Sequence, residues 1–130
     1  MNPDPAYVTE VPVPTVPQFE TVTLAELLDK ELPPRENVLA PWLPCQGLAM
    51  IHAPRGVGKT HIALGIAYAV ACGGSFLRWQ AVTPRNVLII DGEMPAVVLQ
   101  ERLASIVKSG ETEPQAKIEF ITPDFQSGCM

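Results

Sequence analysis

One stretch of eight residues, APRGVGKT at positions 53–60, restricts the fold of this chain more than any other part of it. It matches a phosphate-binding pattern in which glycine or alanine is followed, after four residues, by Gly-Lys and then Ser or Thr. A short apolar run at 48–52 precedes the stretch, and a helix-forming segment at 61–72 follows it. Because strand, glycine-bearing loop and helix occur in this order, we predict an anion-binding loop that joins a strand to the N-terminus of a helix.

The residue types of this loop indicate its chemistry. Gly56 and Gly58 lack a Cβ, so the backbone can turn sharply and bring its N–H groups close to an anion. The ammonium of Lys59 can reach the terminal phosphates of a nucleotide, and the hydroxyl of Thr60 suits Mg²⁺. The alternative is a glycine turn without a ligand. We expect ATP and Mg²⁺ to be bound by Ala53, Pro54, Arg55, Gly56, Val57, Gly58, Lys59, Thr60 and His61.

A second candidate element, Asp91-Gly92-Glu93, follows the apolar run at 87–90. The run consists of β-favouring residues only, which predicts a parallel strand buried on both faces. Ligands of open α/β sheets bind beyond the carboxyl ends of such strands, so Glu93 is expected to face the same crevice as the loop and to orient an attacking water. Asp91 either holds Mg²⁺ through water or only caps the next helix. For Glu93, too, the alternative to the catalytic role is to cap that helix.

The remaining elements complete an α/β pattern. We expect a short edge strand within 76–82, a helix that starts near Pro95 and ends at Gly110, and a third parallel strand at 117–121. The strands at 48–52 and 87–91 should run parallel in a doubly wound sheet. Trp42 lies in an irregular segment at 35–46 and either packs against the core or lines a base-binding pocket.

The N-terminal third differs in composition from the rest. Five prolines among the first twenty residues predict a disordered leader over 1–22, with docking to an aromatic-lined groove as the alternative. Thr23 and Glu26 form the pattern of a capping box, which predicts a short helix before Pro33. The expected organisation is therefore a leader at 1–22, a short helix and lead-in at 23–44, and the main domain at 45–130.

The charge and the cysteines of the chain indicate which partners it can have and in which cellular compartment it is located. The net charge of −5 argues against a role in coating nucleic acid, although residues 45–110 carry six basic and three acidic side chains, as anion binding requires. The three cysteines are scattered without metal-ligand spacing, which is typical of free thiols in a reducing cytosol. No apolar run approaches the roughly 20 residues of a membrane helix. We expect a cytoplasmic protein without a membrane partner.

Residues from about 45 to 107 resemble the start of a RecA-like ATPase core, and most closely the RepA-type group of hexameric replicative helicases and related plasmid and phage ATPases. The resemblance rests on the phosphate loop and on IIDGEMP, followed by a helix that contains Arg102. It implies that Glu93 is the catalytic glutamate and that Lys59 and Thr60 hold phosphate and Mg²⁺. It also implies ATP hydrolysis in the service of DNA replication, a homo-hexamer, and DNA contacts made by a C-terminal part that is missing here.

The chain departs from that family in two respects. Ala53 replaces the first glycine, and no apolar strand ending in aspartate follows Glu93, because Pro123 precedes Asp124 and breaks the last strand. We therefore predict the N-terminal part of a RecA-like doubly wound sheet, truncated after about three core strands and poorly active by itself. The alternatives are a helicase-loader-type AAA+ ATPase, which Gly58–Ala63 also resembles, a small-molecule kinase, and a nucleotide-binding module without turnover.

Overall fold

The computed structural model describes residues 12–16 and 18–128, and the chain divides into two units, Met1–Pro33 and Pro34–Met130. The first unit contains one helix, α1 (Leu24–Asp29), and its N-terminus has the predicted capping box. The Glu26 N–H donates to the Thr23 hydroxyl at 3.3 Å, and the Thr23 N–H donates to the Glu26 carboxylate at 2.8 Å. The second bond lowers the pKa of Glu26. The leader residues 1–11 and 17 lie outside the described residues.

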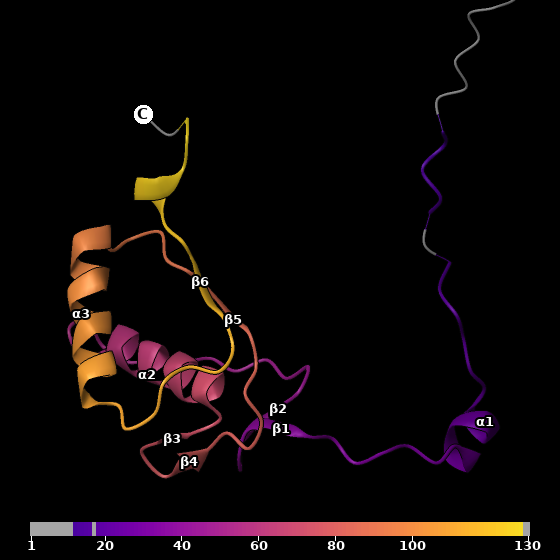
Figure 1. Cartoon of the computed structure of the whole chain (residues 1–130). Coiled ribbons are helices and arrows are strands. Elements are labelled where there is room, and N and C mark those ends of the chain that lie inside the picture. The colour runs from indigo at the N-terminus through magenta and orange to yellow at the C-terminus, as the bar shows by residue number, and fades with distance from the viewer. Residues whose placement is uncertain (1–11, 17, 129–130) are drawn as a thin grey trace, which may run out of the picture. The chain divides into compact units, whose positions relative to one another are not determined.

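The second unit carries the remaining elements, which Figure 1 labels. It has two antiparallel pairs, β1 with β2 and β3 with β4, and one parallel pair, β5 with β6. The elements are β1 (Asn37–Leu39), β2 (Leu43–Pro44), α2 (Lys59–Cys72), β3 (Ser75–Phe76), β4 (Trp79–Gln80), β5 (Val87–Ile90), α3 (Ala96–Ser109), β6 (Ile118–Ile121) and a 3-10 turn (Pro123–Phe125).

Helix α2 is the centre of this unit, because its residues from Leu64 to Cys72 are buried, apart from half-buried Ile66, and pack into two separate apolar clusters. Two sides of the helix therefore contribute to the core. The first cluster joins it to α3, β5 and β6 and contains Leu64, Tyr68, Cys72, Leu99 and Ile106. The second joins it to the two antiparallel pairs and contains Leu39, Val70 and Ala81. The helix ends at Gly73, which adopts the left-handed conformation typical of a glycine C-cap.

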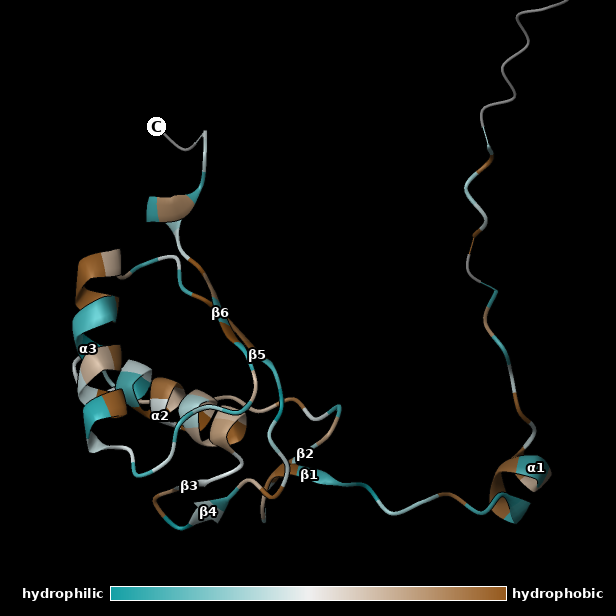
Figure 2. Ribbon diagram, viewed as in Figure 1, coloured by the Kyte–Doolittle hydropathy of each residue, from teal (hydrophilic) through white to brown (hydrophobic). Residues whose placement is uncertain are grey.

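The parallel pair confirms the prediction of two parallel strands after α2, with Val87 opposite Ile118 and Ile90 opposite Ile121. The expectation that β5 is buried on both faces is wrong for this structure. Its residues alternate between half-buried and exposed, and Ile90 is 72% exposed. Figure 2 shows how apolar the two strands are. The reason is that α2 and α3 pack on the face that carries Ile89 and Phe120, and no described element covers the other face.

The strand expected at residues 48–52 is not present. This segment has no ladder partner in the described chain, and Met50 is 89% exposed. Consequently, the predicted parallel alignment of this segment with β5 is also absent. The apolar sequence favours an extended backbone, but a strand forms only when another strand takes up its hydrogen bonds, and β5 pairs with β6 alone. The described part is a small α/β unit with a two-stranded parallel sheet.

The segment expected to be an irregular lead-in forms β1 and β2, and the structural division falls after Pro33 rather than after residue 44. The physical reason is burial: Leu39 is completely buried and packs with Val70 of α2. Trp42 belongs to the same cluster and meets Trp79 edge-on, with ring centroids 5.1 Å apart. The packing interpretation of Trp42 is thus the one that the structure supports.

Candidate functional site

The phosphate-binding pattern forms a glycine-bearing turn that leads directly into α2. Gly56 and Gly58 have φ of 85° and 90°, a left-handed conformation that disfavours residues with a Cβ, and the space around both is open. Gly58 is the N-cap of α2, and no side chain caps the helix. The first N–H groups of α2 therefore have no side-chain acceptor and are suited to an anion.

The ammonium of Lys59 is held by its own loop. Its Nζ donates to the carbonyl of Ala53 at 2.7 Å and to the carbonyl of Pro54 at 2.8 Å. Lys59 is half-buried and the loop residues Arg55 and Val57 are exposed. Since an ammonium has three donors, a phosphate must compete with these two carbonyls or use the third donor.

A hollow of about 760 Å³ connects the loop to the end of β5. It brings together four of the predicted site residues, Arg55 and Thr60 from one side and Asp91 and Glu93 from the other. A smaller hollow of about 320 Å³ beside it adds Lys59. The larger hollow is lined by Arg55, Thr60, Ile90, Asp91, Gly92, Glu93, Met94, Pro95, Val98 and Arg102.

Asp91 organises the turn between β5 and α3. One of its carboxylate oxygens accepts hydrogen bonds from the N–H groups of Glu93 and Met94, both at 2.9 Å. These bonds hold the turn before α3, which begins at Ala96, so Asp91 does not cap that helix; its Mg²⁺ role remains a prediction. The side chain of Glu93 is exposed at the same hollow, and its carboxylate accepts no hydrogen bond from the described chain.

Two contributors to this site were assigned differently from sequence. Asp124 was considered only as a failed metal-binding aspartate, yet its carboxylate accepts the Ala96 N–H at 2.7 Å and so caps α3. Arg102 was noted only as part of the helix after the DGEMP sequence, yet it is half-buried and lines the hollow. Its spacing of four residues from Val98 was the available signal, because residues at i and i+4 share one helix face.

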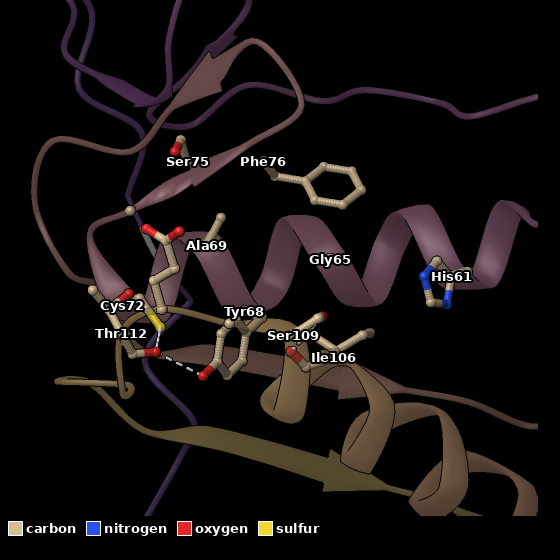
Figure 3. Close-up of a pocket in the computed structure, with 13 residues that line it drawn as sticks. His61, Gly65, Tyr68, Ala69, Cys72, Ser75, Phe76, Ile106, Ser109 and Thr112 are labelled. Atoms are coloured by element: carbon tan, nitrogen blue, oxygen red, sulfur yellow. Dashed lines mark hydrogen bonds between the residues drawn. The ribbon is translucent and has the colours of Figure 1, made fainter.

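His61 belongs to a different hollow, of about 450 Å³, between α2, the β3–β4 hairpin and the end of α3 (Figure 3). At the opposite end of this hollow, the carbonyl of Thr112 accepts hydrogen bonds from the Tyr68 hydroxyl at 2.7 Å and from the Cys72 thiol at 3.5 Å. Burial raises the pKa of Tyr68. The structure thus does not bring the His61 side chain to the hollow that holds Thr60 and Glu93.

The residue types at the loop are suited to binding phosphate and a hard cation such as Mg²⁺. Thr60 and Asp91, which carry a hydroxyl and a carboxylate, both line the two adjoining hollows, and oxygen ligands are those that Mg²⁺ prefers. Within residues 12–16 and 18–128 no group of three or more His, Cys, Asp or Glu side chains forms a metal site. Because Mg²⁺ keeps several waters and is bound largely through substrate phosphates, one or two protein oxygens are sufficient.

A glycine-bearing loop before a central helix, with acidic residues at the end of the neighbouring parallel strand, defines a phosphate-loop ATPase-like unit. A family model described as an AAA domain matches residues 13–127, and the chain belongs to this family of phosphate-loop ATPases. Comparison with curated proteins and with solved structures gives no significant match. Among the described residues, no helix has the length and apolar character needed to cross a membrane.

Proposed function

We propose that this chain binds ATP with Mg²⁺ at residues 53–60 and that Glu93 supports hydrolysis of the bound nucleotide. One observation carries the proposal: a single hollow is lined by Thr60 of the loop and by Glu93 at the end of β5. Membership in a phosphate-loop ATPase family supports the nucleotide as ligand. The finer assignment to a RecA-like, RepA-type enzyme rests on the DGEMP sequence.

The residues have separate tasks in this proposal. The N–H groups after Gly58 and the ammonium of Lys59 bind the phosphates, and Thr60 holds the cation, with Asp91 as a water-mediated candidate. Bound Mg²⁺ would supply charge neutralisation on the phosphate oxygens. Glu93 orients and polarises a water, a task for which its exposed carboxylate is available, since it accepts no hydrogen bond within residues 12–16 and 18–128. Asp91 keeps that carboxylate in place by holding the backbone of the turn.

Binding is tested with Lys59→Met, which keeps the length of the side chain but removes the charge. We expect the affinity for a fluorescent ATP analogue to fall at least about 10-fold, since a charge-assisted hydrogen bond contributes about 1.5–3 kcal/mol. Lys117→Met is the matched control, because Lys117 is exposed and lines none of the hollows around the loop. Equal affinity in wild type and Lys59→Met would refute the phosphate-loop assignment.

Hydrolysis is tested with Glu93→Gln. The amide keeps the shape of the side chain, so nucleotide binding should stay within a factor of two or so, while phosphate release should fall about 10²–10⁴-fold, the range for loss of a positioned general base. Glu101→Gln on the exposed side of α3 serves as control. Full turnover by Glu93→Gln would leave this residue as a strand-end carboxylate only.

The wider role that we propose is ATP-driven DNA helicase or related replication activity in plasmids or phages, carried out in the cytoplasm by a hexamer. A helicase-loader-type AAA+ ATPase is the alternative within the superfamily. For the 130 residues themselves, binding without turnover is the second candidate. It is favoured by the engagement of Asp91 with the backbone, and a phosphate-release assay on this chain decides between the two.

A further inference from the structure

Another hollow lies apart from the candidate site, between α3, the end of β6 and the 3-10 turn that follows β6. We call it the α3–β6 hollow. Its volume of about 570 Å³ is within the range of small-molecule pockets, roughly 300–1,000 Å³. Helix α3 supplies much of its apolar lining, including Val97, Leu103 and Val107, and Phe120 of β6 and Phe125 of the turn add two aromatic rings. The proposed function has no use for this hollow.

The lining of the α3–β6 hollow is apolar, uncharged and open to solvent. Val97 is 60% exposed and Phe125 is 75% exposed. Within the part of the chain that the structure describes, no charged side chain lines the hollow, and its polar side chains are those of Gln100 and Thr122. A charged ligand would lose hydration here without gaining a counter-charge, so the lining favours a ligand that is neutral and mostly apolar.

Thr122 supplies a specific polar group at this hollow. The residue is 1% exposed, and its hydroxyl has no hydrogen-bond partner within residues 12–16 and 18–128. The carbonyl of the same residue is engaged, because it accepts from the N–H of Phe125 and from the side-chain amide of Gln126, both at 3.3 Å. A buried hydroxyl without a partner destabilises a fold, and a ligand with a hydrogen-bonding group of its own would remove this penalty.

The walls of the hollow are held in place by contacts of the chain itself. The carboxylate of Asp124 accepts the N–H of Ala96 at 2.7 Å, which ties the 3-10 turn to the first turn of α3. On its other side, α3 is anchored by Leu99 and Ile106, which are buried in the cluster with α2. A hollow that is formed before binding requires little ordering of the protein when a ligand enters.

We propose that the α3–β6 hollow binds a neutral, mostly apolar small molecule that makes one hydrogen bond with the Thr122 hydroxyl. The proposal is independent of the nucleotide site, because none of the residues proposed to bind nucleotide or cation lines this hollow. An apolar side chain from a protein partner could fill the same volume, but it would leave the hydroxyl unpaired. A ligand with its own polar group satisfies both the apolar lining and the hydroxyl.

The test is an NMR titration of the whole chain with two neutral bicyclic probes. Indole has an N–H donor, and indene has nearly the same shape without it. Binding is followed through the methyl resonances of Val97, Leu103 and Val107. We expect both probes to shift these resonances, with indole bound about 2- to 10-fold more tightly than indene, as one neutral hydrogen bond provides. Indoleacetate, which is negatively charged, should bind more weakly than indole.

Thr122→Val tests the hydrogen bond, because valine has the shape of threonine without the hydroxyl. In this variant the affinity for indole should fall to that for indene, and the affinity for indene should stay within about twofold of wild type. The variant should remain folded, since it removes an unpaired buried group and leaves the apolar contacts in place.

A matched pair of variants locates the probes. Ala104→Phe adds a phenyl ring inside the hollow and should abolish binding of both probes. Ser105→Phe adds the same ring at the next position of α3, outside the hollow, and should change neither affinity. Both positions are exposed, so neither ring enters the buried cluster between α3 and α2.

Several results would overturn the proposal. Equal affinities for indole and indene in wild type would show that the Thr122 hydroxyl takes no part, and binding that survives Ala104→Phe would place the probes elsewhere. Methyl resonances that do not respond to either probe would exclude a small-molecule site. A dimer in sedimentation equilibrium that Ala104→Phe dissociates would instead identify the hollow as an interface between copies of the chain.

Discussion

Gly65→Ala is a sharp test of how α2 is packed. A Cβ built on Gly65 would lie 2.2 Å from Cε2 and 2.6 Å from Cζ of the Phe76 ring, so the ring has to move. Phe76 is half-buried in the β3–β4 hairpin, with its ring centroid 6.2 Å from that of Trp79. Overpacking of this kind costs about 1–3 kcal/mol. In a helix interior, replacing glycine by alanine gains about 1 kcal/mol. We therefore expect a net loss of about 1 kcal/mol in the free energy of unfolding.

The decisive measurement is a double-mutant cycle by urea unfolding. In a Phe76→Ala background the obstructing ring is absent, so Gly65→Ala should now stabilise the protein by about 0.5–1 kcal/mol. The sign of the effect should thus reverse between the two backgrounds, with a coupling energy of about 2 kcal/mol. Ala63→Gly, at an exposed position of the same helix, measures the contribution of helix propensity to the free energy of unfolding by itself. If Gly65→Ala stabilises both backgrounds equally, the ring does not occupy the space above Gly65.

Two further predictions concern buried polar groups. Tyr68→Phe removes the 2.7 Å hydrogen bond to the Thr112 carbonyl and should cost about 1 kcal/mol in chemical denaturation at neutral pH. Burial raises the pKa of Tyr68 above 10, so the neutral phenol stabilises the fold below pH 10 and this stabilisation is lost as the pH rises through the folded-state pKa. Wild type should therefore lose stability more steeply than Tyr68→Phe above pH 10, and parallel curves would contradict this. Thr122 is 1% exposed with a hydroxyl that has no hydrogen-bond partner in the described chain, so Thr122→Val should raise the free energy of unfolding by about 1 kcal/mol, whereas a loss would mean that the hydroxyl is bonded.

Local chemistry made part of this structure predictable from sequence. The capping box at Thr23 and Glu26 specifies a helix start without outside help, and α1 forms there. Gly56, Gly58 and Gly73 occur where the backbone needs positive φ, and all three adopt it. These features depend on residues a few positions apart, so the sequence contains all the information they need.

Tertiary structure decided what depends on partners distant in the chain. The apolar run at 48–52 has the sequence of a strand, yet in the described chain no other strand lies beside it to take up its hydrogen bonds. The sequence of β5 is typical of a strand that is buried on both faces. In the structure, helices cover only one face of the described sheet, and Ile90 is exposed. Strand pairing and burial are properties of neighbours rather than of the strand itself, which is why composition alone misjudged them.

The candidate site likewise has residues that the sequence predicts and residues whose position depends on the tertiary structure. The loop, Lys59, Thr60 and Glu93 were recognisable from sequence because each has a residue type with a clear chemical task at a set spacing. The roles of Asp124 and Arg102 were not, because one acts across 28 residues on the N–H of Ala96 and the other depends on which side of α3 meets the hollow. The sequence by itself predicts a phosphate-bearing ligand, since glycine, lysine and threonine chemistry is local. Only the folding of β6 and α3 against α2 decided which charges stand beside that ligand, because it brings together residues that no spacing rule connects.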